Sequence, residues 1–168
     1  VNLVTPTHYA AQIAEAIEIA KAGGLSIPIV YNCSGFESVE VLKFLEGFID
    51  IYLPDAKYDS DSEALRNSGA VKYVENNRVA LVEMYRQVGN LVMDENGIAK
   101  RGLIIRHLVL PEGRAGTKGV LNWIVKNIPN VHLSLMSQYF PAHRALSEPG
   151  LNRNITEDEY EEALDCLE

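Results

Sequence analysis

The chain has 168 residues, of which 47% are hydrophobic, and its formal net charge at pH 7 is -8. This length and apolar share suffice for a buried core, so we expect residues 1–168 to form a single domain rather than a disordered chain. The acidic charge argues against general attraction to nucleic acid or to anionic membranes. No apolar run approaches the roughly 20 residues that span a bilayer, and no basic and apolar leader opens the chain, which predicts a soluble, cytoplasmic protein.

Short β-branched runs alternate with amphipathic stretches, which is typical of repeated βαβ units and a parallel sheet. The first part of the chain predicts strands at 2–5, 27–31 and 49–53, separated by helices at 9–22 and 38–45. Thr7 is expected to cap the first of these helices. Gly23 and Gly24 are expected to end it.

The second part continues the alternation, with one reversal of chain direction. A helix is predicted at 73–87, followed by an apolar run at 91–93 and a hairpin-like turn at the Asn-Gly pair 96–97. Further strands are predicted at 102–110 and 131–136, on either side of a helix at 118–127, and Thr156 with Glu159 forms a capping box for a last helix. These elements predict an α/β fold, a partial (β/α) barrel with about five parallel strands.

A polar motif follows or ends each predicted parallel strand. In an α/β barrel the carboxyl ends of the strands lie at one rim, where side chains from separate strands converge. The motifs are Thr5-Pro6-Thr7-His8, Tyr31-Asn32-Cys33-Ser34-Gly35-Phe36, Pro54-Asp55-Ala56-Lys57, Ile105-Arg106-His107-Leu108 and Met136-Ser137-Gln138-Tyr139-Phe140-Pro141. The sequence therefore predicts a polar rim at one end of the sheet.

Alternation along the strand at 102–110 separates two of these polar residues. Arg106 shares one face with Ile104 and Leu108, whereas His107 lies on the opposite face with Ile105. Burying an unpaired arginine in an apolar strand costs several kcal/mol, so Arg106 must meet a ligand or a carboxylate such as that of Asp55. We expect His107 to be structural.

Five ordered blocks of the sequence carry a family resemblance: Asn2-Leu3-Val4-Thr5-Pro6-Thr7-His8, Tyr31-Asn32-Cys33-Ser34-Gly35, Asp50-Ile51-Tyr52-Leu53-Pro54-Asp55-Ala56-Lys57, Glu83-Met84-Tyr85-Arg86-Gln87-Val88-Gly89 and Ile105-Arg106-His107-Leu108-Val109-Leu110-Pro111. Together they resemble the radical S-adenosylmethionine proteins, in the branch of the pyruvate formate-lyase activating enzymes. The resemblance implies a (β/α)6 partial barrel that binds S-adenosylmethionine and a [4Fe-4S] cluster. It also implies reductive cleavage to methionine and a 5'-deoxyadenosyl radical, which in activating enzymes attacks a backbone glycine of a partner glycyl-radical enzyme.

The same resemblance implies binding roles at the rim. Asp55 and Lys57 match the Asp-x-Lys pair that helps hold the amino acid and ribose parts of S-adenosylmethionine, and Arg106 matches the arginine of the family's fourth strand here. Further cofactor-binding candidates are Thr7, His8, Asn32, Ser34 and Tyr139. Activating enzymes have Gly-Gly-Glu where this chain has Pro6-Thr7-His8, and Asp-Thr-Asn-Gly where it has Asn32-Cys33-Ser34-Gly35.

The cysteine motif of that family is missing. The only cysteines are Cys33 and Cys166. A [4Fe-4S] cluster needs several thiolates, which the family supplies from C-x-x-x-C-x-x-C. Because the chain opens at Val1 and runs straight into an apolar segment, we expect the carboxyl-terminal part of a longer enzyme, starting at the family's second strand. The iron-sulfur cluster, the catalysis and the protein substrate are then expected of that longer enzyme, the parent, alone. We expect this chain to contain no metal site and no catalytic residue.

A second hypothesis involves no redox chemistry. A barrel domain of this kind binds a phosphate-like or nucleotide-like ligand, or serves as an interaction module. The segment Gly113-Arg114-Ala115-Gly116-Thr117 before the helix at 118–127 is the candidate phosphate loop, because phosphates bind where glycine-rich loops enter helices. In the fragment hypothesis, the strand at 2–5 has an unpaired edge, which predicts self-association through it.

Overall fold

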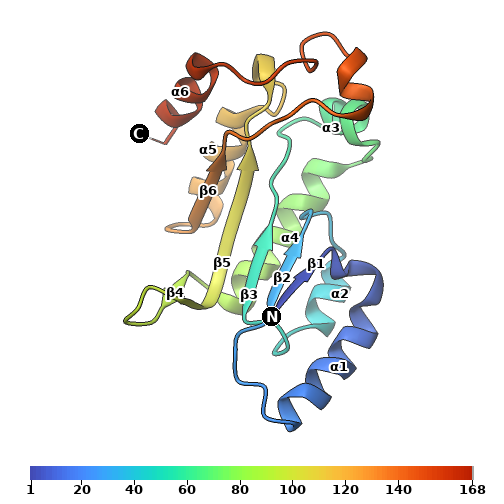
Figure 1. Cartoon of the computed structure of the whole chain (residues 1–168), viewed down its shortest axis with the longest axis vertical. Coiled ribbons are helices and arrows are strands. Elements are labelled where there is room, and N and C mark those ends of the chain that lie inside the picture. Colours follow the sequence, from blue (N-terminus) through green and yellow to red (C-terminus); the bar gives the residue numbers. More distant parts are fainter. Residues whose placement is uncertain (168) are drawn as a thin grey trace.

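The computed structural model describes residues 1–167, which fold around one mostly parallel sheet (Figure 1). Neighbouring parallel strands follow the order β1, β2, β3, β5, β6, and the short β4 pairs antiparallel with β5. The strands are β1 (Asn2–Val4), β2 (Val30–Cys33), β3 (Ile51–Pro54), β4 (Val92–Met93), β5 (Ala99–Leu108) and β6 (His132–Met136). The predicted α/β class and parallel sheet are confirmed.

Helices connect these strands. The α-helices are α1 (Ala10–Ala22), α2 (Val39–Phe44), α3 (Asp61–Ser68), α4 (Tyr73–Val88), α5 (Thr117–Asn127) and α6 (Glu157–Asp165). Short 3-10 helices are η1 (Pro6–Tyr9), η2 (Pro111–Gly113) and η3 (His143–Ser147). In Figure 1, the arrows of the parallel strands β2, β3, β5 and β6 point toward the end of the molecule where α3 and α6 lie.

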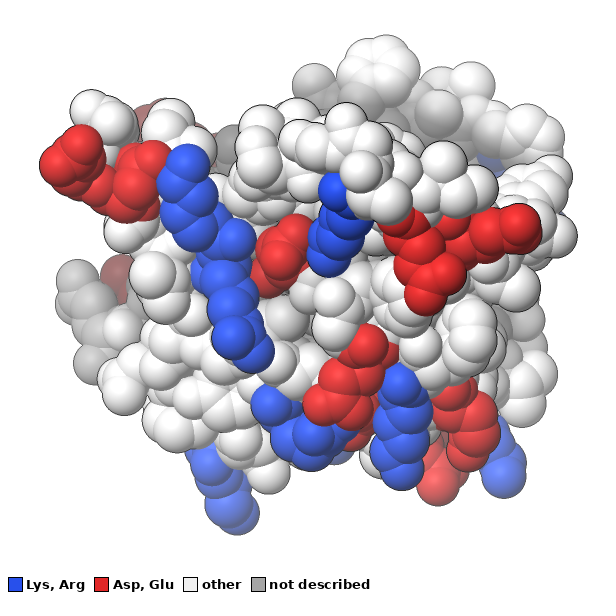
Figure 2. Space-filling view, turned by 90° about the horizontal axis from the view of Figure 1, so that it is seen from below, with Lys and Arg blue, Asp and Glu red and all other residues white. Residues whose placement is uncertain are grey.

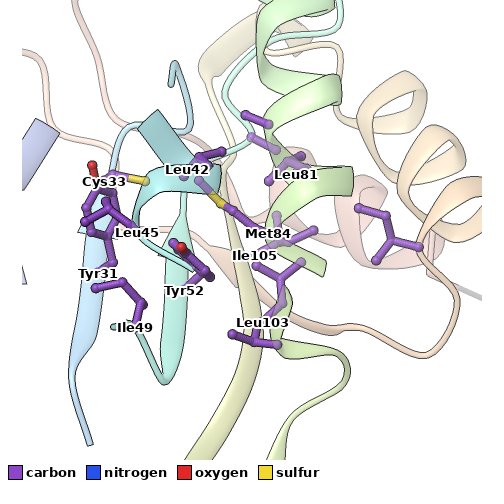
Figure 3. Close-up of a cluster of buried hydrophobic side chains, with 14 of the residues drawn as sticks. Tyr31, Cys33, Leu42, Leu45, Ile49, Tyr52, Leu81, Met84, Leu103 and Ile105 are labelled. Atoms are coloured by element: carbon purple, nitrogen blue, oxygen red, sulfur yellow. The ribbon is translucent and has the colours of Figure 1, made fainter. Parts of the chain in front are cut away.

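The main core lies between the sheet and α1, α2, α4 and α5. Every second residue of the strands points its side chain into this core. The aromatic rings of Tyr31 and Tyr52 meet edge to face within it. Figure 3 shows these two tyrosines with Leu42 and Leu45, and Met84 near Leu103 and Ile105. Because side chains alternate along a strand, the remaining strand residues point to the other face of the sheet, which these four helices leave uncovered.

Three local expectations require correction. Thr7 does not cap α1, since it lies within η1, and its hydroxyl donates to the carboxylate of Glu37. The second strand begins at Val30 rather than Ile27, so Asn32 and Cys33 lie inside β2 and not after it. The helix α3 was not predicted, because its short polar sequence has no apolar periodicity. The capping box of Thr156 and Glu159 is confirmed.

Charged side chains of both signs are interspersed on the face at the amino ends of the strands (Figure 2). That face therefore presents no extended field of one sign, although the net charge is -8. Among residues 1–167, no helix is both long enough and apolar enough to cross a membrane.

The strand β1 forms an edge of the sheet, and we expect the chain to self-associate there. Val1 and Thr5 direct backbone bonds to β2, so the intervening groups of Asn2 and Val4 point outward. Val4 is also 67% exposed. Light scattering at increasing protein concentration should show dimers or larger species, and Val4→Lys should suppress them because an edge lysine opposes strand pairing.

The matched control is Ile19→Lys, which changes an equally exposed apolar side chain on α1. It should leave self-association unchanged. A wild-type chain that stays monomeric at high concentration would contradict pairing through β1.

Candidate functional site

The carboxylate of Asp55 lies between two cationic side chains. Its Oδ2 is 2.7 Å from Lys57 Nζ, and its Oδ1 is 2.7 Å from a terminal nitrogen of Arg106. The side chains of Asp55, Arg106 and Lys57 are 15%, 23% and 37% exposed. We call these three residues the charge trio. One carboxylate faces two cations, so the trio has a net positive charge within an acidic protein.

The strands bring the charge trio together at one end of the sheet. Asp55 follows β3 directly and lies opposite Arg106 of β5 in the parallel pairing. Ser134 of β6 is the next residue across in the same row. Arg106 points to the uncovered face and His107 is fully buried on the helix side, as the alternation predicted. Of the two partners that the sequence left open for Arg106, a ligand or a carboxylate, the structure shows the carboxylate of Asp55.

One donor of Arg106 has no partner. Its Nε is buried and makes no hydrogen bond within residues 1–167. Leaving a buried donor unsatisfied costs about 1–3 kcal/mol, so such a group at the end of a sheet is a candidate ligand contact. An acceptor arriving on the uncovered face would satisfy it.

Asn32 and Ser34 lie near this end of the sheet, at the end of β2. Asn32 is opposite Leu53 of β3 and alternates with the core residues Tyr31 and Cys33, so its side chain shares the uncovered face. Ser34 is exposed just after the strand. The structure thus places Asn32 on the strand next to β3 and Ser34 just after that strand.

Thr7 belongs to a buried polar cluster that the sequence did not reveal. Glu37 is buried, and it accepts hydrogen bonds from Thr7 Oγ1 at 3.0 Å and Tyr31 Oη at 3.2 Å. Burial raises the pKa of the Glu37 carboxyl, and the bonds from Thr7 and Tyr31 oppose that rise. A lone glutamate before the cap residue Ser38 is typical of a solvated loop, so only the tertiary structure identifies it.

The raised pKa of Glu37 gives a pH-dependent stability. The folded state binds the carboxyl proton more tightly than the unfolded state does. The cost of burying the charged carboxylate therefore lowers stability fully at a pH above the folded-state pKa, and this loss disappears as the pH falls below that pKa. We therefore expect Glu37→Gln to gain stability relative to wild type at pH 8 and to lose most of that gain at pH 4, below the ordinary pKa of a glutamate. Urea unfolding of both proteins at each pH measures this difference. A difference that does not change with pH would contradict a raised pKa.

The other two rim candidates lie outside the charge trio's contacts. His8 is exposed on η1. The hydroxyl of Tyr139 donates to the Leu151 carbonyl oxygen at 2.8 Å, and its ring packs on a second apolar cluster that includes Tyr58 and Leu110. Its hydroxyl is therefore engaged in a structural bond.

The two cysteines do not form a metal site. Cys33 is buried in the main core, where burial raises the pKa of its thiol and keeps it protonated. Cys166 follows α6, and its thiol donates to the Glu162 carbonyl oxygen. In the part of the chain that the structure describes, no group of three histidine, cysteine or acidic side chains is placed to hold a metal. The described residues therefore do not fit a [4Fe-4S] cluster.

The candidate phosphate loop borders a cavity of about 550 Å³ between the start of α5 and α6. Gly116 precedes α5 in a left-handed conformation, as in many tight loops. Four acidic side chains line this cavity against one lysine, Lys118, and the acidic residues are Asp59, Glu159, Glu162 and Asp165. Asp59 is paired with Arg78, and Glu159 is paired with Arg153. Glu162 and Asp165 still add negative charge to the lining, which disfavours phosphate and weakens the second hypothesis.

No protein-family model matches the chain. An uncharacterized protein of Methanocaldococcus jannaschii is 31% identical over 144 residues, which cover 85% of this chain and 38% of that protein. The chain thus spans well under half the length of the curated relative that it matches. In that protein, the region similar to this chain is part of a longer chain.

Proposed function

We propose that this chain forms the S-adenosylmethionine-binding part of a radical S-adenosylmethionine enzyme related to the pyruvate formate-lyase activating enzymes. The charge trio is the observation that carries the proposal, because Asp55, Lys57 and Arg106 meet at the carboxyl end of parallel strands. The five ordered sequence blocks support it. The longer relative supports a parent protein that extends beyond this segment.

The donor set suits the polar groups of S-adenosylmethionine. Lys57 and Arg106 are placed to hold the methionine carboxylate, and the buried Arg106 Nε offers a further donor. Asp55 is suited to the amino group or the ribose hydroxyls, with Asn32 of β2 and Ser34 just after that strand as further polar groups. In this class of enzyme, bound S-adenosylmethionine would supply a carbon-centred radical for hydrogen abstraction after one-electron reduction by the parent's cluster, with release of methionine.

This chain's side chains are proposed to bind and orient the ligand, and the rest of the chemistry is assigned to the parent protein. Asp55 holds both cations apart at fixed positions before any ligand arrives, which lowers the cost of ordering them on binding. Because these residues lie on an uncovered sheet face, we expect weak binding by this chain alone. The cluster belongs to the parent, whose proposed partner is a cytoplasmic glycyl-radical enzyme.

Nuclear magnetic resonance of the 168-residue chain tests the proposed binding. Addition of S-adenosylmethionine should shift the backbone amides of Asp55, Lys57 and Arg106. Lys57→Met should weaken binding at least about tenfold, since it removes a charge-assisted hydrogen bond worth roughly 1.5–3 kcal/mol. Lys118→Met is the control, because Lys118 lines the separate cavity beside α5.

Either of two outcomes would contradict the proposal. One is a set of shifts centred on residues 113–117 that Lys118→Met abolishes, which would favour a ligand site at α5. The other is no shift at roughly 10 mM ligand, a concentration that detects millimolar affinity.

A further inference from the structure

We infer that Asn77, Tyr73 and His107 are positioning residues that fix the backbone of Asp55-Ala56-Lys57 from the helix side of the sheet. Asn77 bonds to the carbonyl oxygen of Asp55, whereas His107 and Tyr73 bond to the carbonyl oxygen and the amide of the Ala56–Lys57 peptide group. The expected effect on ligand binding rests on the proposed function, whereas the rigidity of the Asp55–Lys57 backbone does not depend on it.

Asn77 of α4 joins the ends of two strands. Its Nδ2 donates to the carbonyl oxygens of Asp55 and Gly35, both at 2.9 Å. The side chain is buried, so loss of this donor would leave two carbonyl oxygens without their partner in a dry environment. Asn77 therefore locks the loop after β2 against the residue that carries the central carboxylate.

Tyr73 fixes the other end of the segment. The Lys57 amide donates to Tyr73 Oη at 2.8 Å. The Tyr73 ring is held by stacking on Phe36 and by an edge contact with Tyr58. Because Tyr73 and Asn77 are four residues apart in α4, they share one face of the helix at its first turn. The start of α4 thus contacts both ends of the Asp55–Lys57 segment.

His107 fixes the middle residue. Its Nδ1 is 2.6 Å from the Ala56 carbonyl oxygen, and its Nε2 is 2.9 Å from Thr117 Oγ1. A carbonyl oxygen only accepts, so Nδ1 carries the proton and Nε2 accepts from the Thr117 hydroxyl. Burial lowers the pKa of His107, which favours this neutral form. The Ala56 amide in turn donates to the Arg106 carbonyl oxygen at 2.8 Å.

These bonds hold the backbone of three consecutive residues, Asp55, Ala56 and Lys57, directly after the end of β3. Irregular backbone at a strand end is ordinarily free to move, but here every one of the three residues is tied to a buried side chain. Asp55 and Lys57 consequently extend from a rigid backbone. Binding then loses less conformational entropy, because the site is already ordered before the ligand arrives. The three positioning residues themselves lie on the helix side, away from the uncovered face.

The test compares Asn77→Leu with Asn76→Leu in the ligand-free 168-residue chain. Leucine keeps the approximate shape of asparagine and removes the donor, and Asn76 is the adjacent, more exposed asparagine of the same helix. Asn77→Leu should shift and broaden the amide signals of residues 55–57 and weaken S-adenosylmethionine binding about tenfold. Asn76→Leu should change neither. If Asn77→Leu lowers only the melting temperature, with unchanged signals and affinity, Asn77 is merely structural and the inference is wrong.

Tyr73→Phe serves as a second, milder variant in case Asn77→Leu fails to fold. It removes the acceptor of the Lys57 amide and keeps the ring that stacks on Phe36. Hydrogen exchange of the Lys57 amide should accelerate at least about tenfold, and unchanged exchange would contradict the role of Tyr73. Because exchange is measured without ligand, failure of the proposed cofactor binding would not affect this result.

Discussion

Replacement of Gly35 with alanine is expected to lower the free energy of unfolding by about 2–5 kcal/mol, because backbone strain and overpacking add at this position. Gly35 has φ of 73°, a left-handed conformation that non-glycine residues adopt at a cost. An added Cβ would overlap the Asp55 carbonyl oxygen and lie 2.5 Å from Asn77 Nδ2. Neither neighbour can withdraw, since the two are bonded to each other.

Gly24→Ala is the matched control for this prediction. Gly24 also has a positive φ, of 97°, but no atom lies within 4 Å of the position that a Cβ would occupy. Its replacement should therefore cost only the backbone term, about 1–2 kcal/mol. Urea unfolding at pH 7 measures both variants. Equal losses at the two glycines would show that the loop after β2 is not closely packed on Asp55.

Removal of the Asp55 carboxylate is expected to have the second large effect. In Asp55→Ala, Arg106 and Lys57 remain near each other without a counter-charge, so we expect a loss of about 1–3 kcal/mol, reduced from the value for a fully buried pair by solvent screening. Binding of S-adenosylmethionine should fall at least about tenfold. Urea unfolding and ligand titration by nuclear magnetic resonance measure the two effects.

A control and a double variant make this prediction specific. Glu46→Ala removes the ion pair between Glu46 and Arg86, in which both side chains are about half exposed, and should cost less than about 1 kcal/mol. If the unpaired Arg106 causes the loss, Asp55→Ala with Arg106→Met should be less destabilised than the sum of the single variants. Strict additivity would show that Asp55 and Arg106 do not interact energetically.

The sequence predicted the parallel sheet and placed Asp55, Lys57 and Arg106 at its carboxyl end, whereas the predicted rim residues Thr7, His8 and Tyr139 lie outside this trio. Alternation along β5 separated Arg106 from His107 correctly, because the period of two is a property of the strand itself. The cost of burying an unpaired cation required a partner for Arg106 but left open whether it is a ligand or a carboxylate. The pairing partner Asp55 was available at a neighbouring strand end, and the structure contains that pair.

Features that depend on packing between distant segments were not predicted. Asn77 lies in a helix whose polar residues are typical of a solvated face, and its bonds to Gly35 and Asp55 depend on how α4 crosses the sheet. Glu37 was missed for the same reason. The start of β2 was misplaced by three residues because Ile27 and Pro28 read as part of an apolar run, whereas proline cannot donate to a sheet.

The most direct test of the central claim uses the longer parent protein that the proposal requires. After anaerobic reconstitution with iron and sulfide, it is reduced and supplied with S-adenosylmethionine, and 5'-deoxyadenosine is measured. We predict about four irons per chain and formation of 5'-deoxyadenosine, with Arg106→Met reducing the rate at least about 100-fold and the 168-residue chain alone binding no iron. A full-length protein that binds no cluster and forms no 5'-deoxyadenosine, or full activity in Arg106→Met, would contradict the account.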